Sequence, residues 1–470
     1  MLVNFGWHKY LDRLSLLNRH IGILTQVRAI LVTESITPMP SAPYRVLLLA
    51  EAANPEWASV PLIGWSLSRA LAKITNAHLV THIRNREALL RVGLVEGRDC
   101  TFIDNEYLTR PIWNLGDKLR GGPGKGWTTM TAFSSLVYYS FELEVWRQLG
   151  PRIKAHEFDL VHRITPLSPT SQSLIASWLA RYNVPFVLGP LNGGVPWPRH
   201  FVDRQHAERE WLSHVRGLYK LMPGYRSTRR DSAAIIAGSK HCYDEMPEWV
   251  RKKLVYIPEN AVDIDRFNAP RDRRASVPLS VAFVGRLVPY KGADILLEAI
   301  MDFLKGGQLE LHIIGDGPQR ALLEAIVDRE RLGNSVQFHG WLPHVEVQEK
   351  LRVCDLMALP SIREFGGAVV IEAMALGVTP VVANYGGPGE LVDDDTGIRV
   401  SFVDKASLVE GMRRAINDII CSPAKLDKFG AAGRRKVLEK LTWDAKANQV
   451  FEVYKAVLVG SKDLRYLDFR

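Results

Sequence analysis

Short apolar runs alternate with helix-spaced apolar residues along most of the chain. Six runs in the first half are typical of buried parallel strands, namely 44–51, 78–83, 158–162, 184–189, 232–237 and 254–257. Between them, the helical spacing of apolar residues predicts helices over 61–74 and 169–182. This alternation of strands and helices predicts a doubly wound α/β domain.

A second series of the same kind occupies the rest of the chain. It comprises a predicted helix over 293–304 and the apolar runs 279–285, 309–314, 336–339, 356–358 and 379–383. The polar stretch 269–276, with one proline and four charged residues, predicts the boundary between the two series. We therefore expect an N-terminal extension over 1–43, Rossmann-like domains over 44–270 and 279–440, and a segment over 441–470 whose helix returns to the first domain.

The composition is that of a globular protein. With 47% hydrophobic and 24% charged residues over 470 positions, it excludes a disordered, collagen-like or coiled-coil chain. The four cysteines lack Cys-x-x-Cys spacing, which indicates neither a disulfide framework nor a zinc site and favours a reducing cytoplasm. No apolar run reaches the ~18 residues of a membrane span, and the N-terminus lacks the pattern of a secretory signal.

The net charge of +9 is distributed unevenly. Residues 1–278 hold 36 Lys and Arg against 25 Asp and Glu, whereas residues 279–470 hold 24 against 26. The basic excess thus belongs to the first half and predicts an anionic partner for that half. The segment 1–43, with Trp and Leu at helical spacing between basic residues, is interpreted either as helix packed on the first domain or as a membrane-surface segment.

The stretch 360–377 is the most informative for chemistry. Glu364 falls in the loop after a predicted strand and Glu372 in the following helix, with seven residues between them. Gly366 and Gly367 lie where the loop becomes the helix, so bare N–H groups and a positive helix end predict an anion or phosphate site. A carboxylate there would accept hydrogen bonds from the hydroxyls of a sugar or ribose.

This stretch resembles the E-x7-E motif of the retaining glycosyltransferases of family 4, which have the GT-B fold of two Rossmann-like domains facing across a cleft. Other segments are similar to that family in the same order along the chain, namely 257–263, 284–292, 311–318, 338–342 and 384–390. The resemblance is dense over 255–400 and looser before that. It implies that the second domain binds the donor and the first binds the acceptor.

The resemblance also implies roles for residues of the second domain. Arg286 and Lys291, with Gly285, would hold the diphosphate of a nucleotide-sugar donor, although spacing alone equally allows Lys291 to be a solvated residue. Glu372 would bind the nucleotide ribose, and Glu364 would contact the donor hexose. The backbone that would contact sugar and phosphate belongs to Phe365, Gly366, Gly367, Ala368 and Val369. Many relatives read E-G-F-G here, whereas this chain reads Glu-Phe-Gly-Gly, which leaves the role of Phe365 open.

Candidates in the first domain are fewer. His162 ends a predicted strand and, by the resemblance, would orient the donor sugar; the alternative is a structural histidine, and His82 is a weaker candidate of the same kind. The acceptor-side candidates are Asn192, Gly193 and Gly194, which otherwise form an ordinary glycine turn, and Lys125 in a basic loop that lacks the P-loop pattern. The Asp-x-Asp runs at 263–265 and 393–395 are interpreted as turns, and no metal is predicted.

These features predict a retaining, metal-independent hexosyltransferase that takes a nucleotide-diphosphate sugar as co-substrate and needs no further cofactor. The expected acceptor is a glycan or lipid-linked glycan of cell-surface polysaccharide or glycolipid biosynthesis, reached from the cytoplasm with peripheral contact to an anionic membrane. A sugar-nucleotide epimerase on the same fold is the alternative. An NAD-dependent oxidoreductase would need G-x-G-x-x-G after the first strand, and a nucleic-acid-binding protein a recognition motif; the sequence has neither.

Overall fold

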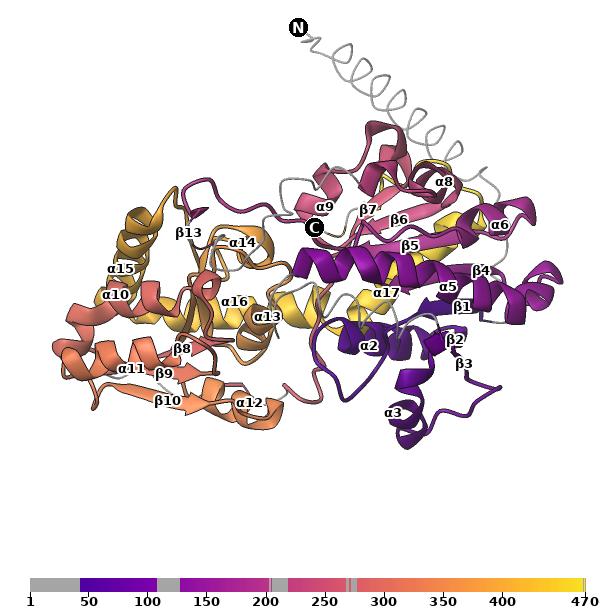
Figure 1. Ribbon diagram of the computed structural model, residues 1–470. Coiled ribbons are helices and arrows are strands. Elements are labelled where there is room, and N and C mark those ends of the chain that lie inside the picture. The colour runs from indigo at the N-terminus through magenta and orange to yellow at the C-terminus, as the bar shows by residue number, and fades with distance from the viewer. Residues whose placement is uncertain are drawn as a thin grey trace, which may run out of the picture. The chain divides into compact units, whose positions relative to one another are not determined.

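The computed structural model describes residues 43–107, 127–202, 204, 219–267, 270–271, 277–467 and 469. Residues 44–470 form one compact unit that contains two parallel sheets (Figure 1). Three predicted features lie outside the described residues: the extension 1–43 except Pro43, the loop that carries Lys125, and most of the boundary 269–276. Among the helices that the structure describes, none is long and apolar enough to cross a membrane.

The first sheet has seven parallel strands in the order β3-β2-β1-β4-β5-β6-β7. The strands are β1 Arg45–Ala50, β2 Asn76–His82, β3 Cys100–Ile103, β4 Leu160–Thr165, β5 Phe186–Leu191, β6 Ala234–Ala237 and β7 Leu254–Tyr256. The helical elements between them are α2 Val60–Ala72, η1 Ile83–Asn85, α3 Arg86–Arg91, α5 Trp127–Lys154, α6 Ile175–Arg181, α8 Tyr225–Asp231, α9 Lys240–Asp244 and η3 Glu248–Lys253. Strand order reverses between β1 and β4, and doubly wound folds bind their ligands beyond the carboxyl ends of strands at such a point.

Strand β1 shows why the first sheet is buried on both faces. Leu47 and Leu49 pack in one apolar cluster with α5 and α6, whereas Val46 and Leu48 pack in another with α2 and the C-terminal helix α17, Trp443–Leu458. All four leucine and valine side chains are at most 1% exposed. Because successive side chains of a strand point to opposite faces, an unbroken apolar run requires helices on both sides.

The second sheet has six parallel strands in the order β10-β9-β8-β11-β12-β13. The strands are β8 Leu279–Val284, β9 Leu309–Ile314, β10 Val336–Gly340, β11 Leu356–Leu359, β12 Thr379–Ala383 and β13 Ile398–Val400. The helical elements are η4 Pro289–Lys291, α10 Ala293–Lys305, α11 Arg320–Arg329, α12 His344–Arg352, α13 Ala368–Ala375, α14 Gly386–Leu391, α15 Lys405–Cys421 and α16 Ala424–Lys440. The order reverses between β8 and β11, so the loops after these two strands meet at the binding edge of the sheet.

A segment that follows β5 packs into the core of the second half. Trp197 and Phe201 are at most 9% exposed and belong to the same apolar cluster as β8, β11 and α10. Arg204 then forms an ion pair with Asp294 of α10, with 2.6 Å between Nη2 and Oδ2. We call residues 195–201 the strap, because Trp197 and Phe201 anchor this segment, which continues from β5 of the first half, in the core of the second half.

The expected α/β class with two doubly wound sheets is confirmed. The pattern predicts a helix over 169–182, whereas α6 is confined to Ile175–Arg181. The residues before α6 stay irregular because the buried guanidinium of Arg163 donates hydrogen bonds to the carbonyls of Pro166 and Ser171. The short strands β3 and β13 and the helix α5 are additional to the predicted elements.

Candidate functional site

The E-x7-E stretch forms the loop between β11 and α13. Gly367 precedes α13 with a φ of 67°, a left-handed conformation that glycine adopts without steric cost. Gly366 has no room for a side chain, because a Cβ atom there would collide with Glu259 Oε1 and Asn260 Nδ2. The loop therefore presents bare backbone and the first N–H groups of α13, which suit an anion or a set of hydroxyls.

Lys291 and Glu364, which the sequence assigned to different parts of a donor, are in direct contact. Their side chains form an ion pair and are 16% and 19% exposed. Burial lowers the pKa of Lys291, but the charge and hydrogen bond of Glu364 outweigh it, so that the pKa is raised above its ordinary value. Ile362 N donates to Tyr290 O at 2.9 Å and holds the two loops together. The site thus carries a fixed cation beside a carboxylate and the glycine loop.

Glu372 lies in the middle of α13. Its side chain is half-buried, and burial raises its pKa to about 7, although the positive charge of Arg266 acts in the opposite direction. A carboxylate that titrates near neutrality is poised to change its hydrogen bonding when a ligand arrives.

Arg286 and Gly285 follow β8 in the loop that leads to Lys291. Arg286 is exposed, whereas Lys291 is half-buried. Gly285 N donates to Ile314 O at 3.0 Å, so the loop continues the pairing of β8 with β9 before it turns. The two predicted cations therefore lie on one loop with different access to water.

Phe365, whose role the sequence leaves open, belongs to a stack that ends on the strap. The guanidinium of Arg363 lies 5.0 Å from the ring centres of both Phe365 and Trp197, and its Nε donates to Val195 O at 3.1 Å. This stack fastens the loop between β11 and α13 to the strap. Sequence reasoning missed Arg363 and Trp197, because nothing in their local pattern indicates a partner so far away in the chain.

The predicted acceptor-side turn is shaped by its own side chain. Asn192 is 5% exposed, and its Oδ1 accepts a hydrogen bond from Gly193 N at 2.7 Å. Asn192 N donates to Leu167 O at 2.8 Å, which ties this turn to the loop after β4. Gly193 and Gly194 have φ values of 132° and 77°, which only glycine adopts readily.

His162 is fully buried, with both ring nitrogens engaged. Nε2 lies 2.6 Å from Gly189 O, and Nδ1 lies 2.6 Å from the hydroxyl of Tyr454 in α17. Because a carbonyl only accepts, Nε2 carries the proton and the tyrosine hydroxyl donates to Nδ1. Burial lowers the pKa of His162 to about 4, so the ring is neutral at pH 7. Contact between His162 and a donor sugar stays a prediction; in this structure the ring joins α17 to the first sheet.

Replacing Tyr454 by Phe is expected to lower the free energy of unfolding by about 1–2 kcal/mol, because Nδ1 of buried His162 loses its donor. In wild type, the folded pKa lies below the unfolded value of ~6.5, so stability should fall as pH drops from 6.5 towards 4. Urea unfolding at several pH values measures both effects. Tyr466→Phe, at an exposed tyrosine, is the control and should unfold like wild type. Equal stability of Tyr454→Phe and wild type would contradict the expectation.

A second polar cluster lies at the carboxyl ends of the first strands. Arg84 Nε is 3.0 Å from Glu106 Oε1, and Arg84 Nη2 is 3.7 Å from Glu51 Oε1. His82 Nε2 lies 3.6 Å from Glu106 Oε1, but burial and the charge of Arg84 lower the histidine pKa to about 4. Sequence reasoning singled out only His82, since charged residues in turns carry no local signal of clustering. The cluster offers a polar ligand hydrogen-bond donors on Arg84 and acceptors on Glu51 and Glu106.

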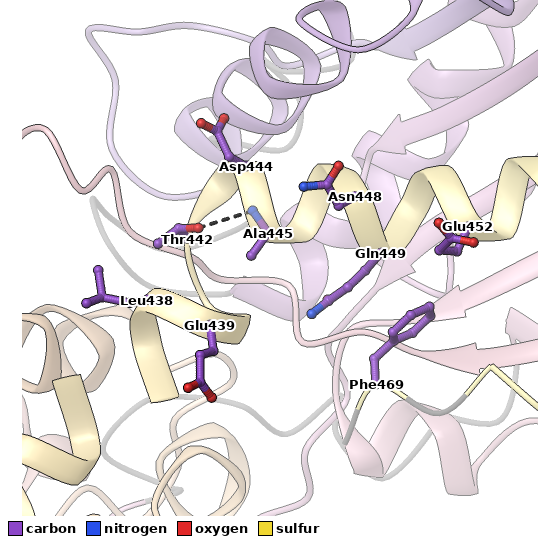
Figure 2. A pocket seen from close by; sticks show the side chains of 9 residues that line it. All are labelled: Leu438, Glu439, Thr442, Asp444, Ala445, Asn448, Gln449, Glu452 and Phe469. Carbon is purple, nitrogen blue, oxygen red and sulfur yellow. Dashed lines mark hydrogen bonds between the residues drawn. The ribbon is translucent and has the colours of Figure 1, made fainter. Parts of the chain in front are cut away.

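Figure 2 shows a separate cavity of about 490 Å³ at the corner between α16 and α17. Its lining residues are Leu438, Glu439, Thr442, Asp444, Ala445, Asn448, Gln449, Glu452 and Phe469. No predicted site residue lines it, and its three carboxylates disfavour an anionic nucleotide. Among the described residues, no three His, Cys, Asp or Glu side chains are grouped so that they could hold a metal ion.

Comparison with known proteins places most of the second half in one family. Residues 268–436 match the family described as "Glycosyl transferases group 1". The chain is 29% identical to glycogen synthase of Mycobacterium tuberculosis over 271 residues, which cover 57% of this chain and 61% of that protein. It is 33% identical to D-inositol 3-phosphate glycosyltransferase of Segniliparus rotundus over 223 residues, 44% of this chain and 48% of that one. The chain thus spans about half to three fifths of these relatives' length.

Solved structures share the fold across both halves. A glycosyltransferase from Rickettsia africae matches with a TM-score of 0.57 and 15% identity, covering 89% of this chain and all of that one. Sucrose-phosphate synthase from Thermosynechococcus elongatus matches with a TM-score of 0.55 and 19% identity over the same shares. At these identities the likeness concerns the fold, and it agrees with two Rossmann-like domains.

Proposed function

Since residues 268–436 match the group 1 glycosyltransferases, we propose that the chain transfers a hexosyl group from a nucleotide-diphosphate sugar to a glycan or lipid-linked acceptor. The observation that carries the proposal is the ion pair of Lys291 with Glu364 beside the glycine loop that opens α13. A cation, free backbone N–H groups and carboxylates in one place match the parts of a sugar diphosphate.

In this proposal each part of the donor has a partner in the second half. Lys291 and Arg286, with the backbone of Gly285, bind the diphosphate and neutralise the charge that develops on the leaving group. Glu364 contacts the hexose and Glu372 the ribose hydroxyls. The backbone of residues 365–369 contacts sugar and phosphate.

Transfer is proposed to proceed on one face of the sugar, with retention. The acceptor oxygen forms a bond to the anomeric carbon while the bond from that carbon to the diphosphate oxygen breaks, and the acceptor proton passes to the leaving diphosphate. The cations of the second half stabilise that leaving group more in the transition state than in the bound donor. Closing of the two halves over the donor would exclude water and limit hydrolysis.

The acceptor is proposed to bind at the carboxyl edge of the first sheet. The cluster of Glu51, Arg84 and Glu106 supplies donors and acceptors for hydroxyl groups there. The turn of Asn192 to Gly194 lies beside Glu259, whose Oε1 abuts Gly366 in the loop between β11 and α13, which we call the donor loop. A polyhydroxylated acceptor fits this chemistry better than an apolar one.

The basic excess of residues 1–278 favours an acceptor presented at the cytoplasmic face of an anionic membrane. We therefore expect the full chain to sediment with vesicles that contain anionic phospholipid, more than with neutral vesicles, and to be released by salt. Vesicle sedimentation at low and high ionic strength measures this. Equal recovery with neutral and anionic vesicles would assign the charge to a solvated surface.

A panel of nucleotides and nucleotide sugars tests the donor assignment. UDP-, GDP- and ADP-sugars are each mixed with the full chain, and the melting temperature is followed. At least one member should raise it, because a ligand that binds only the folded state stabilises by mass action. The donor site would be contradicted if no member of the panel raised the melting temperature of wild type and Lys291→Ala behaved in the same way.

A further inference from the structure

Two buried polar side chains of the first half, Glu259 and Asn260, meet the donor loop at Gly366. Glu259 follows β7 and is 8% exposed, and Asn192 follows β5 and is 5% exposed. Glu259 Oε1 and Asn260 Nδ2 occupy the space that a Cβ atom of Gly366 would need, so the carboxylate abuts the backbone of the donor loop. Here a side chain of the first half touches the loop that is proposed to carry the sugar.

The Glu259 carboxylate is only partly satisfied by its surroundings. Asn260 Nδ2 donates to Oε1 at 3.2 Å. Burial raises its pKa to about 7; the amides of Asn192 and Asn260 lower it, and the charges of Glu364 and Glu390 raise it further. These neighbours offer the carboxylate no full ion pair within the described residues.

A buried lysine on α17 also fails to neutralise this carboxylate by direct contact. Lys446 is 2% exposed, and among the described residues its Nζ has no hydrogen-bond partner. Burial lowers its pKa to about 7, while the charge of Glu259 acts in the opposite direction. The charge of Lys446 thus acts on Glu259 without a hydrogen bond, and the carboxylate oxygens remain available to other partners.

Asn192 contributes the complementary group. Its Oδ1 is taken by Gly193 N, whereas its buried Nδ2 lies near the Glu259 carboxylate without reaching hydrogen-bond geometry to any described residue. A buried amide N–H without a partner costs free energy of about 1–3 kcal/mol, so such a group marks a place where a ligand can be bound. The unsatisfied donor lies beside the Glu259 carboxylate, and that carboxylate in turn abuts Gly366 of the donor loop.

We propose that Asn192 and Glu259 bind one hydroxyl group of the transferred sugar and so select the sugar. A hydroxyl both donates and accepts, so it satisfies both side chains: Asn192 Nδ2 donates to its oxygen and Glu259 accepts its proton. A phosphate lacks the proton and would be repelled by the carboxylate. The inference rests on the proposed function, because it assigns a subsite to the donor sugar, and it adds a selective contact from the half that is proposed to bind the acceptor.

The test separates binding of the sugar from binding of the nucleotide. Affinities of the full chain are measured by titration calorimetry for three pairs: UDP and UDP-glucose, GDP and GDP-mannose, ADP and ADP-glucose. For the pair that wild type binds, Asn192→Ala and Glu259→Ala should weaken the sugar nucleotide about tenfold and leave the bare nucleotide unchanged. Glu259→Gln, which keeps an acceptor oxygen, should lose less than Glu259→Ala.

Glu390→Gln is the matched control, because Glu390 is another glutamate whose charge acts on Glu259. Its Oε2 already accepts from Lys240 N at 2.8 Å and from the Tyr256 hydroxyl at 3.0 Å, so the ratio of the two affinities should stay that of wild type. Unchanged nucleotide affinity in the variants shows that they are folded. Equal weakening of both ligands, or none of either, would overturn the inference while the proposed function stands. Failure of wild type to bind any pair would instead overturn the proposed function.

Discussion

Replacing Lys291 by Ala is expected to lower kcat/KM for sugar transfer by about 10²–10³-fold. Lys291 is the half-buried cation at the end of the loop after β8, and its ammonium is held in place by Glu364. The diphosphate gains negative charge as the bond to the sugar breaks, so a fixed cation stabilises the transition state more than the bound donor. Initial rates of nucleotide release at several donor concentrations measure the change.

The control for this substitution is a lysine of the same half with a similar ion pair. Lys305 Nζ lies 2.7 Å from Glu330 Oε2 at the surface, and Lys305→Ala should leave the rate unchanged. Lys291→Ala also leaves the Glu364 carboxylate without its ion-pair partner. The melting temperature of the double variant Lys291→Ala with Glu364→Gln shows whether that unpaired charge affects folding. A folded Lys291→Ala protein with a rate within threefold of wild type would refute the role of Lys291.

Replacing Glu372 by Gln is expected to weaken donor binding by about 10–100-fold, because the carboxylate that is proposed to accept the ribose hydroxyls loses its charge. In wild type, donor affinity should also fall as the pH drops through about 7, the value to which burial raises the pKa of Glu372. Protonation removes the acceptor, so the affinity of Glu372→Gln should be low and insensitive to pH. Titration calorimetry between pH 6 and 8.5 measures both.

The same substitution should stabilise the ligand-free protein at high pH. The folded pKa of Glu372 lies above the unfolded value, so its contribution to stability is lost as pH rises through about 7. Glu372→Gln should therefore melt at a higher temperature than wild type at pH 8. Glu349→Gln, at an exposed glutamate of α12, is the control and should change neither property. Weaker stability together with normal donor affinity would assign Glu372 a structural role.

Local patterns predicted the second half best. The apolar run 309–314 coincides with β9, and the helix predicted from 293 begins where α10 begins, because both are buried along their length by near neighbours. The helix α5 was not predicted, although Tyr138, Phe141 and Val145 recur at helical spacing on its buried side. Edge strand β3 is too short for its pattern to separate it from a turn.

The parts of the site that depend on long-range contact were not predictable in this way. Glu364 and Lys291 were found because their motifs are local, whereas the strap residue Trp197 shows its role only when Arg363 stacks on it. Glu259 looks like a turn residue until the fold brings it against Gly366. His162 illustrates the reverse case: the sequence placed it at the end of a strand, whereas it lies inside β4, Leu160–Thr165. Nothing in the local pattern indicated the tyrosine 292 positions away that occupies its Nδ1.

The most direct test of the central claim follows the sugar itself. The full chain is incubated with a nucleotide sugar labelled in the hexose, with and without a glycolipid extract, and the products are separated and their anomeric configuration read by NMR. The account predicts that label moves to an acceptor only when extract is present, that nucleoside diphosphate is released in equal amount, and that configuration is retained. Conversion of the labelled donor into an epimeric nucleotide sugar without any acceptor would contradict it.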